Sequence, residues 1–473
     1  MKTIKKTLSA LAVITVMLTI ILFCLANADT TSMLKSPQTV EAVAETAEMV
    51  ADAGAQANID TLSTIEKTTI KEEPSANPSV VDGLPANTSV GEELPVEPEE
   101  EVFQEYDISL IAVGDNLMHM GVVRSGVLPD GSRDYTFLYQ NISDFLEKAD
   151  IKIINQETIL AGNERGFSGF PAFNSPTEVG DAIAKSGFNV VLHASNHSAD
   201  QGKDGLISCA NFWSENYPDI LVPGISADAE TAGEIPLLSI GDITFAILNY
   251  TYGPNMEVLP KSLEGHLNIL CNYNPDNYQL DFTTLNPQVI TDIQEAEKLA
   301  DVVIVCPHWG TEYTPNPSSY QKEFAQQMTQ AGADVIIGTH PHVTQPIEWI
   351  TSENGNRCLC YYSLGNYVST QKGGLSMLEA MAWVTFHVSE EEVTISEETT
   401  GVVPLVCQYT SGPVRIENIY LLENYTADLA ASHGIHAYGG VNLTLEDLQG
   451  WSHDILGDFV LPTDAILKNE SAQ

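Results

Sequence analysis

The segment GADVIIGTHPHVTQP, from Gly332 to Pro346, joins a short apolar run to two histidines, His340 and His342. A run of β-branched residues is typical of a buried strand, which we predict over Asp334–His342. In an extended chain, residues two positions apart point to the same side. The spacing therefore predicts that both imidazoles face one pocket at the end of this strand.

Apolar runs that end in polar residues recur along the chain, with amphipathic stretches between them. Strands are predicted over Ile108–Asp115, Ile151–Glu157, Phe188–Ala194 and Asp301–Gly310. Helices are predicted over Phe137–Asp150, Pro176–Gly187, Thr291–Ala300 and Ser319–Ala333. This alternation indicates an α/β fold. Two further stretches, Ile235–Tyr250 and Met381–Ile395, have the pattern of antiparallel hairpins, so we expect two sheets.

The polar residues at the strand ends form a consistent chemical set. Ligand sites in open α/β sheets lie beyond the carboxyl ends of the strands. Those ends carry Asp115, Asn155, Glu157, Asn196, His197, His308, His340 and His342. Taken singly, each has an ordinary structural explanation, such as a turn, a helix cap or a packed core histidine. Together, carboxylate, imidazole and carboxamide groups without thiols suit Mn, Fe or Zn. Two ions about 3.5–4 Å apart would use both His340 and His342.

The order of these residues resembles the calcineurin-like metallophosphoesterase superfamily and, more closely, the CapA family of capsule (poly-gamma-glutamate) synthesis proteins. The resemblance covers roughly residues 106–403 and is carried by six stretches. They are AVGDNLMH (112–119), INQET (154–158), SGFNVVLHASNHSADQGKDGL (186–206), PHWGTEY (307–313), AGADVIIGTHPHVTQPIE (331–348) and YYSLGNYV (361–368).

The resemblance implies a four-layer α/β/β/α sandwich with mixed sheets and a dinuclear metal site. The implied metal ligands are Asp115, Glu157, Asn196, His308, His340 and His342. It also implies that His197 is the general acid that protonates the leaving oxygen. Glu312, Gln345 and Asn366 align with positions that shape the pocket in the family.

Two motifs depart from the superfamily pattern. Leu117 stands where the superfamily has the histidine of Asp-x-His, and Asn155-Gln156-Glu157 replaces Gly-Asp-x-x-Asp, as in the CapA family itself. His119 lies four residues after Asp115 and would reach the same side if a helical turn began there. We therefore keep His119 and Asn155 as further candidate ligands.

Charge and the first hundred residues bear on partners and localisation. The chain has 64 acidic and 20 basic residues, a net charge of −44, which would repel nucleic acids. Three lysines precede an apolar stretch from Leu8 to Leu25, so residues 1–28 are expected to be a signal peptide or a membrane anchor. Residues 29–105, with seventeen acidic and three basic residues, are expected to be a disordered linker. The body would then be extracytoplasmic, either anchored or secreted.

The remainder divides into a CapA-like domain over 106–421 and a C-terminal extension over 422–473. We assign the extension no chemistry and expect its His433 and His436 in a solvated loop. Cys358 and Cys360 alternate along a predicted strand and are expected to be core residues on one face.

Three functions remain open from the sequence. The first is an exported metal-dependent hydrolase acting in the synthesis of capsule, poly-gamma-glutamate or another envelope polymer. The second is a catalytically degenerate, membrane-tethered scaffold for a capsule synthase or exporter. The third is a secreted metallophosphoesterase with a small substrate.

Overall fold

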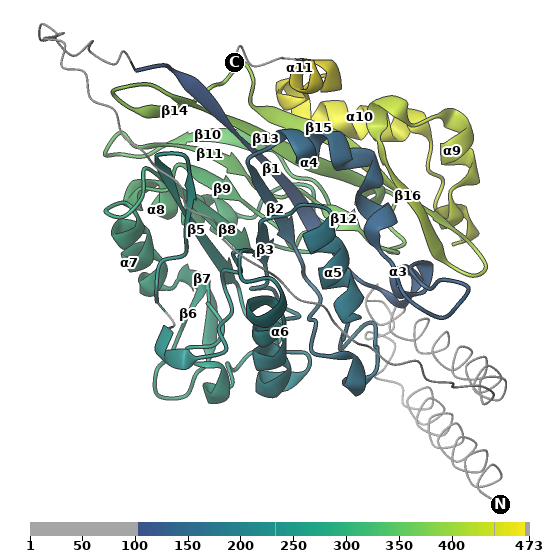
Figure 1. Ribbon diagram of the computed structural model, residues 1–473, viewed down its shortest axis with the longest axis horizontal. Coiled ribbons are helices and arrows are strands. Elements are labelled where there is room, and N and C mark those ends of the chain that lie inside the picture. Colours follow the sequence, from purple (N-terminus) through teal and green to yellow (C-terminus); the bar gives the residue numbers. More distant parts are fainter. Residues whose placement is uncertain (1–102, 232, 439, 469–473) are drawn as a thin grey trace, which may run out of the picture. The chain divides into compact units, whose positions relative to one another are not determined.

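The computed structural model describes residues 103–231, 233–438 and 440–468, and the described residues from Gln104 onward form one compact unit. The predicted export segment over 1–28, and the predicted linker except for its last three residues, lie outside the described residues. Within the described part of the chain, none of the helices has the length and apolar composition that a bilayer span requires. Two large sheets pack face to face with helices on their outer sides (Figure 1).

The first sheet has eight strands and is mixed. They are β1 (Tyr106–Asn116), β2 (Ile151–Asn155), β3 (Val190–Leu192), β12 (Asn366–Val368), β13 (Leu378–Val388), β14 (Val393–Ile395), β15 (Gly401–Thr410) and β16 (Arg415–Leu421). β1 runs parallel to β2 and β12, β2 runs parallel to β3, and β13 is antiparallel to β1. β13 and β14 form the antiparallel pair predicted over Met381–Ile395.

The second sheet has six strands, in the order β10-β11-β9-β8-β5-β4. Their bounds are β4 (Leu237–Ile240), β5 (Ile243–Thr251), β8 (Val302–His308), β9 (Val335–Ile337), β10 (Ile347–Thr351) and β11 (Arg357–Tyr361). β5, β8, β9 and β11 are parallel, and β4 pairs with β5 as the predicted hairpin. A separate two-stranded sheet, β6 (Cys271–Tyr273) and β7 (Leu280–Leu285), lies in the connection from β5 to β8.

A hydrophobic core fills the space between the two large sheets. Alternate residues of β1, such as Ile108 and Leu110, belong to this core together with Phe245 from β5. The rings of Phe245 and Phe386 meet edge to face across the interface, with centroids 5.2 Å apart. The α/β class with two mixed sheets, predicted from the sequence, is confirmed. The strands are buried on both faces, which explains why their sequences are continuous apolar runs.

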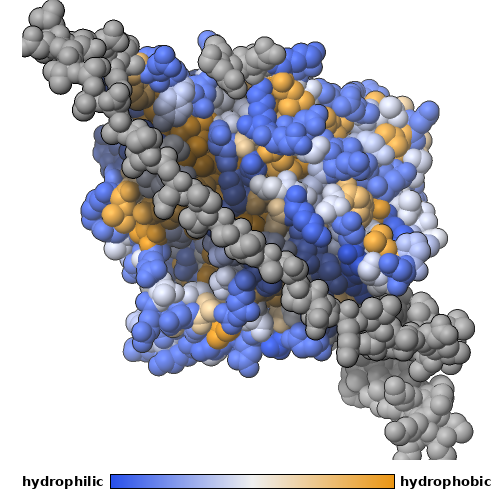
Figure 2. All heavy atoms as spheres, in the orientation of Figure 1, coloured by the Kyte–Doolittle hydropathy of each residue, from blue (hydrophilic) through white to orange (hydrophobic). Residues whose placement is uncertain are grey.

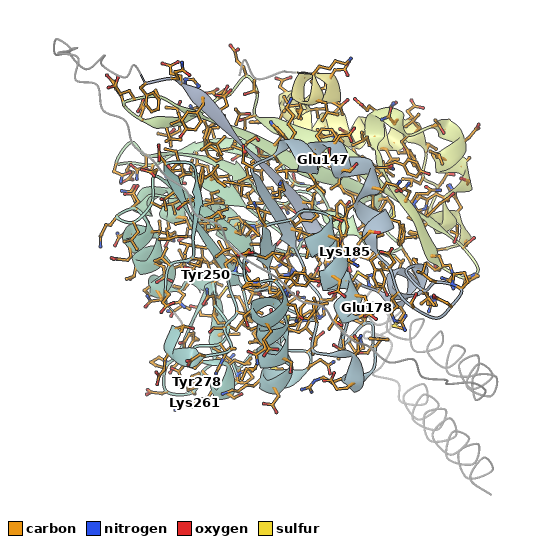
Figure 3. The ribbon with its side chains drawn as sticks, in the orientation of Figure 1. Glu147, Glu178, Lys185, Tyr250, Lys261 and Tyr278 are labelled. Atoms are coloured by element: carbon orange, nitrogen blue, oxygen red, sulfur yellow. The ribbon has the colours of Figure 1, made fainter. Side chains whose placement is uncertain are left out.

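Helices cover the outer faces of both sheets and complete four layers. They are α3 (Met120–Ser125), α4 (Ser143–Lys148), α5 (Thr177–Lys185), α6 (Gly202–Asn216), α7 (Pro287–Ala296), α8 (Ser319–Ala331), α9 (Ala427–Ser432), α10 (Leu445–Leu456) and α11 (Thr463–Leu467). The core outside the first sheet includes Ile183 and Trp213, and the core outside the second includes Ile293 and Phe324. Tyr250, labelled in Figure 3, donates a hydrogen bond from β5 to Asp292 of α7.

Two predicted helices differ from the structure. The helix predicted over Thr291–Ala300 begins earlier, at Pro287, because the side chain of Asn286 caps it by accepting from the Gln288 N–H. The helix predicted over Phe137–Asp150 is divided into a 3₁₀ segment, Thr136–Ile142, and α4.

The C-terminal helices α9–α11, yellow in Figure 1, lie beside β15 and β16 and share the core of the first sheet. His433 is buried there, with its Nε2 atom 2.9 Å from the Cys407 carbonyl oxygen. The expectation of a solvated loop is therefore wrong for His433. Cys358 and Cys360, on β11, are both buried in the core outside the second sheet, as predicted.

The visible face of the folded unit is largely hydrophilic, with separate hydrophobic areas (Figure 2). This agrees with a sequence of 64 acidic and 20 basic residues. A surface of this kind favours solubility and attracts cations.

Candidate metal centre

The carboxyl ends of parallel strands from both sheets carry one cluster of polar side chains. β1 ends with Asp115, β2 with Asn155 and β8 with His308. Glu157, Asn196, His340 and His342 lie in the loops that follow β2, β3 and β9. Each of these side chains is buried and has a partner or neighbour within the cluster. The six residues proposed as metal ligands therefore converge.

Glu157 lies at the centre of the cluster. Its Oε1 atom is 3.8 Å from His342 Nε2, 3.9 Å from His308 Nε2 and 4.0 Å from His197 Nε2. Neither carboxylate oxygen accepts a hydrogen bond from any described residue, although the side chain is fully buried. An unpartnered buried carboxylate is costly, because burial removes its hydration without replacing it. Three imidazole nitrogens at nearly equal distance leave room for a cation that would supply the missing contact.

Asp115 links both sheets. Its Oδ1 accepts a hydrogen bond from Asn155 Nδ2 at 2.7 Å, and its Oδ2 is 3.1 Å from His342 Nδ1. His342 Nδ1 is also 3.1 Å from Asn366 Oδ1. These contacts hold the His342 ring through Nδ1, so its Nε2 faces Glu157.

His308 is fixed by contacts to both ring nitrogens. Its Nδ1 lies 3.0 Å from the Thr339 hydroxyl, and its Nε2 lies 2.9 Å from Asn196 Oδ1. Asn196 therefore directs its carboxamide oxygen, the metal-ligating end of the group, toward the cluster.

The backbone that presents His340 and His342 is not the extended segment predicted from their spacing. β9 ends at Ile337, and the two histidines have φ angles of 97° and 56°. Their ring centroids nevertheless lie 5.7 Å apart. The loop is held in place because the His340 N–H donates to Asp115 and the Tyr313 N–H donates to Pro341. Left-handed conformations cost roughly 1–3 kcal/mol in residues other than glycine and gather at functional sites.

His119 does not reach the cluster by the predicted helical turn. The residue precedes α3 with extended backbone angles, φ −53° and ψ 157°, and α3 begins only at Met120. Its buried ring packs against Phe173, with centroids 5.6 Å apart, and Phe173 in turn contacts His197 at 4.6 Å. Burial, and then the charges of the nearby His342 and His197, lower the pKa of His119 to about 3, so the ring borders the cluster.

The three residues aligned with pocket positions occupy different places. Glu312 brings a carboxylate within 4.8 Å of ligand atoms of His340 and His342. Asn366 contacts His342. Gln345 makes its side-chain hydrogen bonds outside the cluster: its Nε2 donates to the Thr314 carbonyl and its Oε1 accepts from Gln321. It supports the loop that carries Glu312.

His197 is oriented by a residue that the sequence interpretation missed. Its Nδ1 lies 2.7 Å from Asp200 Oδ2, and that oxygen also accepts from the Phe173 N–H at 2.7 Å. The carboxylate on Nδ1 fixes the orientation of the ring and leaves Nε2 facing Glu157. The His-x-x-Asp spacing in SNHSAD, residues 195–200, was the available signal.

The protonation of the cluster follows from burial and charge. Burial raises the pKa of the Glu157 carboxyl well above its usual range. The charge of His342 opposes this rise, and the charge of Asp115 adds to it. Burial, with neighbouring imidazoles, lowers the pKa of His308 and His340 well below the usual value, which favours the neutral, metal-binding form. Burial also opposes the charged form of His342, but Glu157 and Asp115 outweigh it and raise its pKa to about 10.

Three overlapping groups among the described residues have the composition and spacing of metal ligands. In each, one ligand atom per residue lies within 4.8 Å of the others. The groups are Glu157, His308 and His340; Asp115, Glu157 and His342; and Glu312, His340 and His342. The Nδ1 atom of His340 is buried and has no hydrogen-bond partner among the described residues, as expected for a nitrogen that would bind a cation. The residues present therefore fit a divalent metal.

Comparison with known proteins identifies the family to which the chain belongs. Residues 109–371 match the sequence model of the family described as "Bacterial capsule synthesis protein PGA_cap". The chain is 32% identical over 204 residues to the PGA biosynthesis protein CapA of Bacillus subtilis (strain 168), which covers 43% of this chain and 48% of that protein. It is 27% identical over 306 residues to the capsule biosynthesis protein CapA of Bacillus anthracis, and this alignment covers 64% of this chain and 68% of that protein.

The matched region spans about half the length of the Bacillus subtilis relative. Among solved structures, a 5'-nucleotidase from Candida albicans SC5314 aligns with a TM-score of 0.32 and 11% identity, over 59% of this chain and 46% of that chain.

Proposed function

The chain belongs to the PGA_cap family of bacterial capsule synthesis proteins, and we propose that it acts on an envelope polymer as a metal-dependent hydrolase. The observation that carries this proposal is the Glu157 carboxylate, which is buried without a hydrogen bond and faces three imidazole nitrogens at 3.8–4.0 Å. A group of this kind is stable when a cation completes its contacts.

We propose two divalent ions, Mn, Fe or Zn, held by Asp115, Glu157, Asn196, His308, His340 and His342. The overlap of the three ligand groups at Glu157, His340 and His342 supports two neighbouring positions. When bound, such ions act as Lewis acids and lower the pKa of water toward neutrality.

The chain's own contribution to a hydrolysis would come from His197 and Asp200. His197 is positioned to donate a proton from Nε2 to the leaving group, while Asp200 holds Nδ1 at 2.7 Å. The Phe173 ring packs edge to face against the His197 ring, with centroids 4.6 Å apart, which helps to hold the imidazole in place. Proton donation by a positioned group of this type contributes roughly 10²–10⁴-fold to a rate.

The acidic chain bears on the substrate and the location. The polymer implied by the family is an anion, which a chain of net charge −44 would repel unless bound cations offset the charge locally. We propose that the metal ions themselves provide this attraction. We also propose that the protein works outside the cytoplasm, secreted or anchored, from the lysines and apolar stretch before residue 28.

A second candidate function is a scaffold that binds metal but does not turn over and that assists a capsule synthase or exporter. The observation that favours it is Leu117, which is buried beside the cluster where the superfamily has a histidine. Without this imidazole, the affinity of the site for one of the two ions would be lower.

One experiment separates these functions. The purified chain is loaded with Mn²⁺ and assayed on an aryl phosphate, a gamma-glutamyl amide and a glycan phosphate, alongside His197→Ala and a control, His387→Ala. The His387 side chain is partly exposed and lies on β13 opposite Asp107. Turnover that is lost only in His197→Ala supports the hydrolase. Metal binding without turnover on any probe supports the scaffold, and activity on the aryl phosphate alone supports a phosphoesterase for small substrates.

A further inference from the structure

Asn255 lies outside the cluster, in the turn that follows β5, and contacts one of its proposed ligands. Its Oδ1 accepts a hydrogen bond from Asn196 Nδ2 at 3.3 Å and a second from the Tyr252 hydroxyl at 3.0 Å. Asn196 Oδ1, at the other end of that carboxamide, lies 2.9 Å from His308 Nε2. One oxygen of Asn255 thus holds the amino end of Asn196 away from the cluster.

The orientation of the Asn196 carboxamide matters because its two ends differ chemically. The oxygen can bind a cation, whereas the amino group is a donor that repels one. A rotation of 180° about the terminal bond exchanges the two ends with little change in shape. A fixed acceptor on the amino side therefore favours the metal-binding orientation.

Tyr252 extends the same contact to a second proposed ligand. Its ring packs against His340 with centroids 4.8 Å apart, while its hydroxyl shares the Asn255 oxygen with Asn196. Asn255 is therefore linked to two loops of the cluster, directly to Asn196 and through Tyr252 to His340.

The backbone at Asn255 also indicates a specific requirement. Asn255 has a φ of 43°, a left-handed conformation that asparagine, aspartate and glycine adopt most readily. The residue is exposed, so its side chain contributes little packing to the core.

From these contacts we infer that Asn255 is a positioning residue that sets the orientation of Asn196 toward the bound metal. The inference rests on the proposed function, because it requires an ion at the cluster. Residues that orient a ligand from outside typically change metal affinity by about 10- to 100-fold.

The test is titration calorimetry of the full chain with Mn²⁺, using two variants that both tolerate the backbone conformation. Asn255→Gly removes the acceptor, and Asn255→Asp keeps it. We expect Asn255→Gly to bind Mn²⁺ about 10- to 100-fold more weakly and Asn255→Asp to bind at least as tightly as the wild type. The melting temperature of each metal-free variant serves as the folding control.

A double-mutant cycle shows whether the effect passes through Asn196. If it does, Asn255→Gly costs no further affinity when Asn196 is already alanine. Equal Mn²⁺ binding by the wild type and Asn255→Gly overturns the inference alone, as does an undiminished effect in the Asn196→Ala background. Absence of Mn²⁺ binding by the wild type overturns the proposed function together with the inference.

Discussion

The Nε2 atom of His342 lies 3.8 Å from Oε1 of Glu157, and neither oxygen of that buried carboxylate accepts a hydrogen bond from a described residue. In the metal-free protein, burial lowers the pKa of His342, but the charges of Glu157 and Asp115 outweigh it and raise the pKa to about 10. A cation that binds His342 must therefore displace its proton.

This competition predicts that metal affinity rises with pH. Because the pKa of His342 is raised to about 10, binding releases its proton throughout the neutral range, together with any proton held by Glu157, whose pKa is also raised. Affinity for Mn²⁺ is expected to increase about tenfold per pH unit for each proton released. Calorimetric titrations at several pH values in buffers of different ionisation enthalpy check both the slope and the proton count. A flat profile in the wild type would exclude His342 as a ligand.

Asp200→Asn is expected to reduce turnover without changing the metal content. The amide keeps the shape of the side chain but can turn its amino group toward His197 Nδ1, which disturbs the ring orientation that the carboxylate fixes. The loss should approach the roughly 10²–10⁴-fold that a positioned general acid contributes. The control is Asp204→Asn, an exposed carboxylate at the start of α6. If Asp200→Asn retains full kcat in an active enzyme, His197 is not the proton donor.

Glu379, on β13, gives a prediction about stability. Both of its carboxyl oxygens are buried without a partner among the described residues, and burial raises the pKa of this group well above its usual range. At neutral pH, Glu379 is ionised in the unfolded chain and must take up a proton on folding. This lowers the free energy of unfolding once the pH rises above the unfolded pKa of about 4.3.

Glu379→Gln removes this cost, so it should raise the free energy of unfolding of the metal-free protein at neutral pH by about 1–3 kcal/mol. The gain should disappear below about pH 4, where both states carry a protonated carboxyl. Urea unfolding at both pH values, in the presence of a chelator, measures this gain in the free energy of unfolding. Glu417→Gln, at an exposed position of β16, should change little. A gain that is the same at both pH values would show that protonation is not the cause.

Gly114 is required by the close approach of β1 to the loop before Asn366. A Cβ atom at this position would lie 2.0 Å from the Gly365 carbonyl oxygen, which also accepts from the Asp115 N–H at 3.0 Å. Gly114→Ala is expected to lower the free energy of unfolding by about 1–3 kcal/mol and to weaken metal binding by displacing Asp115.

The matched control is Gly450→Ala in α10, where no described atom lies within 4 Å of the new Cβ apart from its chain neighbours and the backbone of the same helix. Alanine there should raise stability by about 0.5–1 kcal/mol, since glycine is a poor helix former. Chemical denaturation of both variants gives the comparison. Similar stabilities would mean that β1 and the Gly365 loop separate without cost.

The sequence indicates the α/β fold and the location of the site because both depend on local patterns. Apolar runs that end in Asp115, Asn155 and His308 become parallel strands, and the carboxyl ends of such strands meet in space. The start of α7 was misplaced by four residues, although Asn286-Pro287 is itself a local helix signal.

Features that depend on distant contacts could not be predicted in the same way. The extended geometry expected for His340 and His342 is replaced by left-handed backbone, because Asp115 and Tyr313 hold that loop from other parts of the chain. The burial of His433 depends on β15, which no pattern near the histidine reveals. The contact of Asn255 with Asn196 joins two loops 59 residues apart.

The central claim is that the cluster around Glu157 holds divalent metal, and the metal content of the purified chain tests it most directly. After equilibration with micromolar Mn²⁺, Fe²⁺ or Zn²⁺ and removal of free ions, elemental analysis should find up to two ions per wild-type chain. His308→Ala and His342→Ala should lose most of this metal, and His387→Ala should retain it. A wild-type chain that takes up none of these ions would contradict the account.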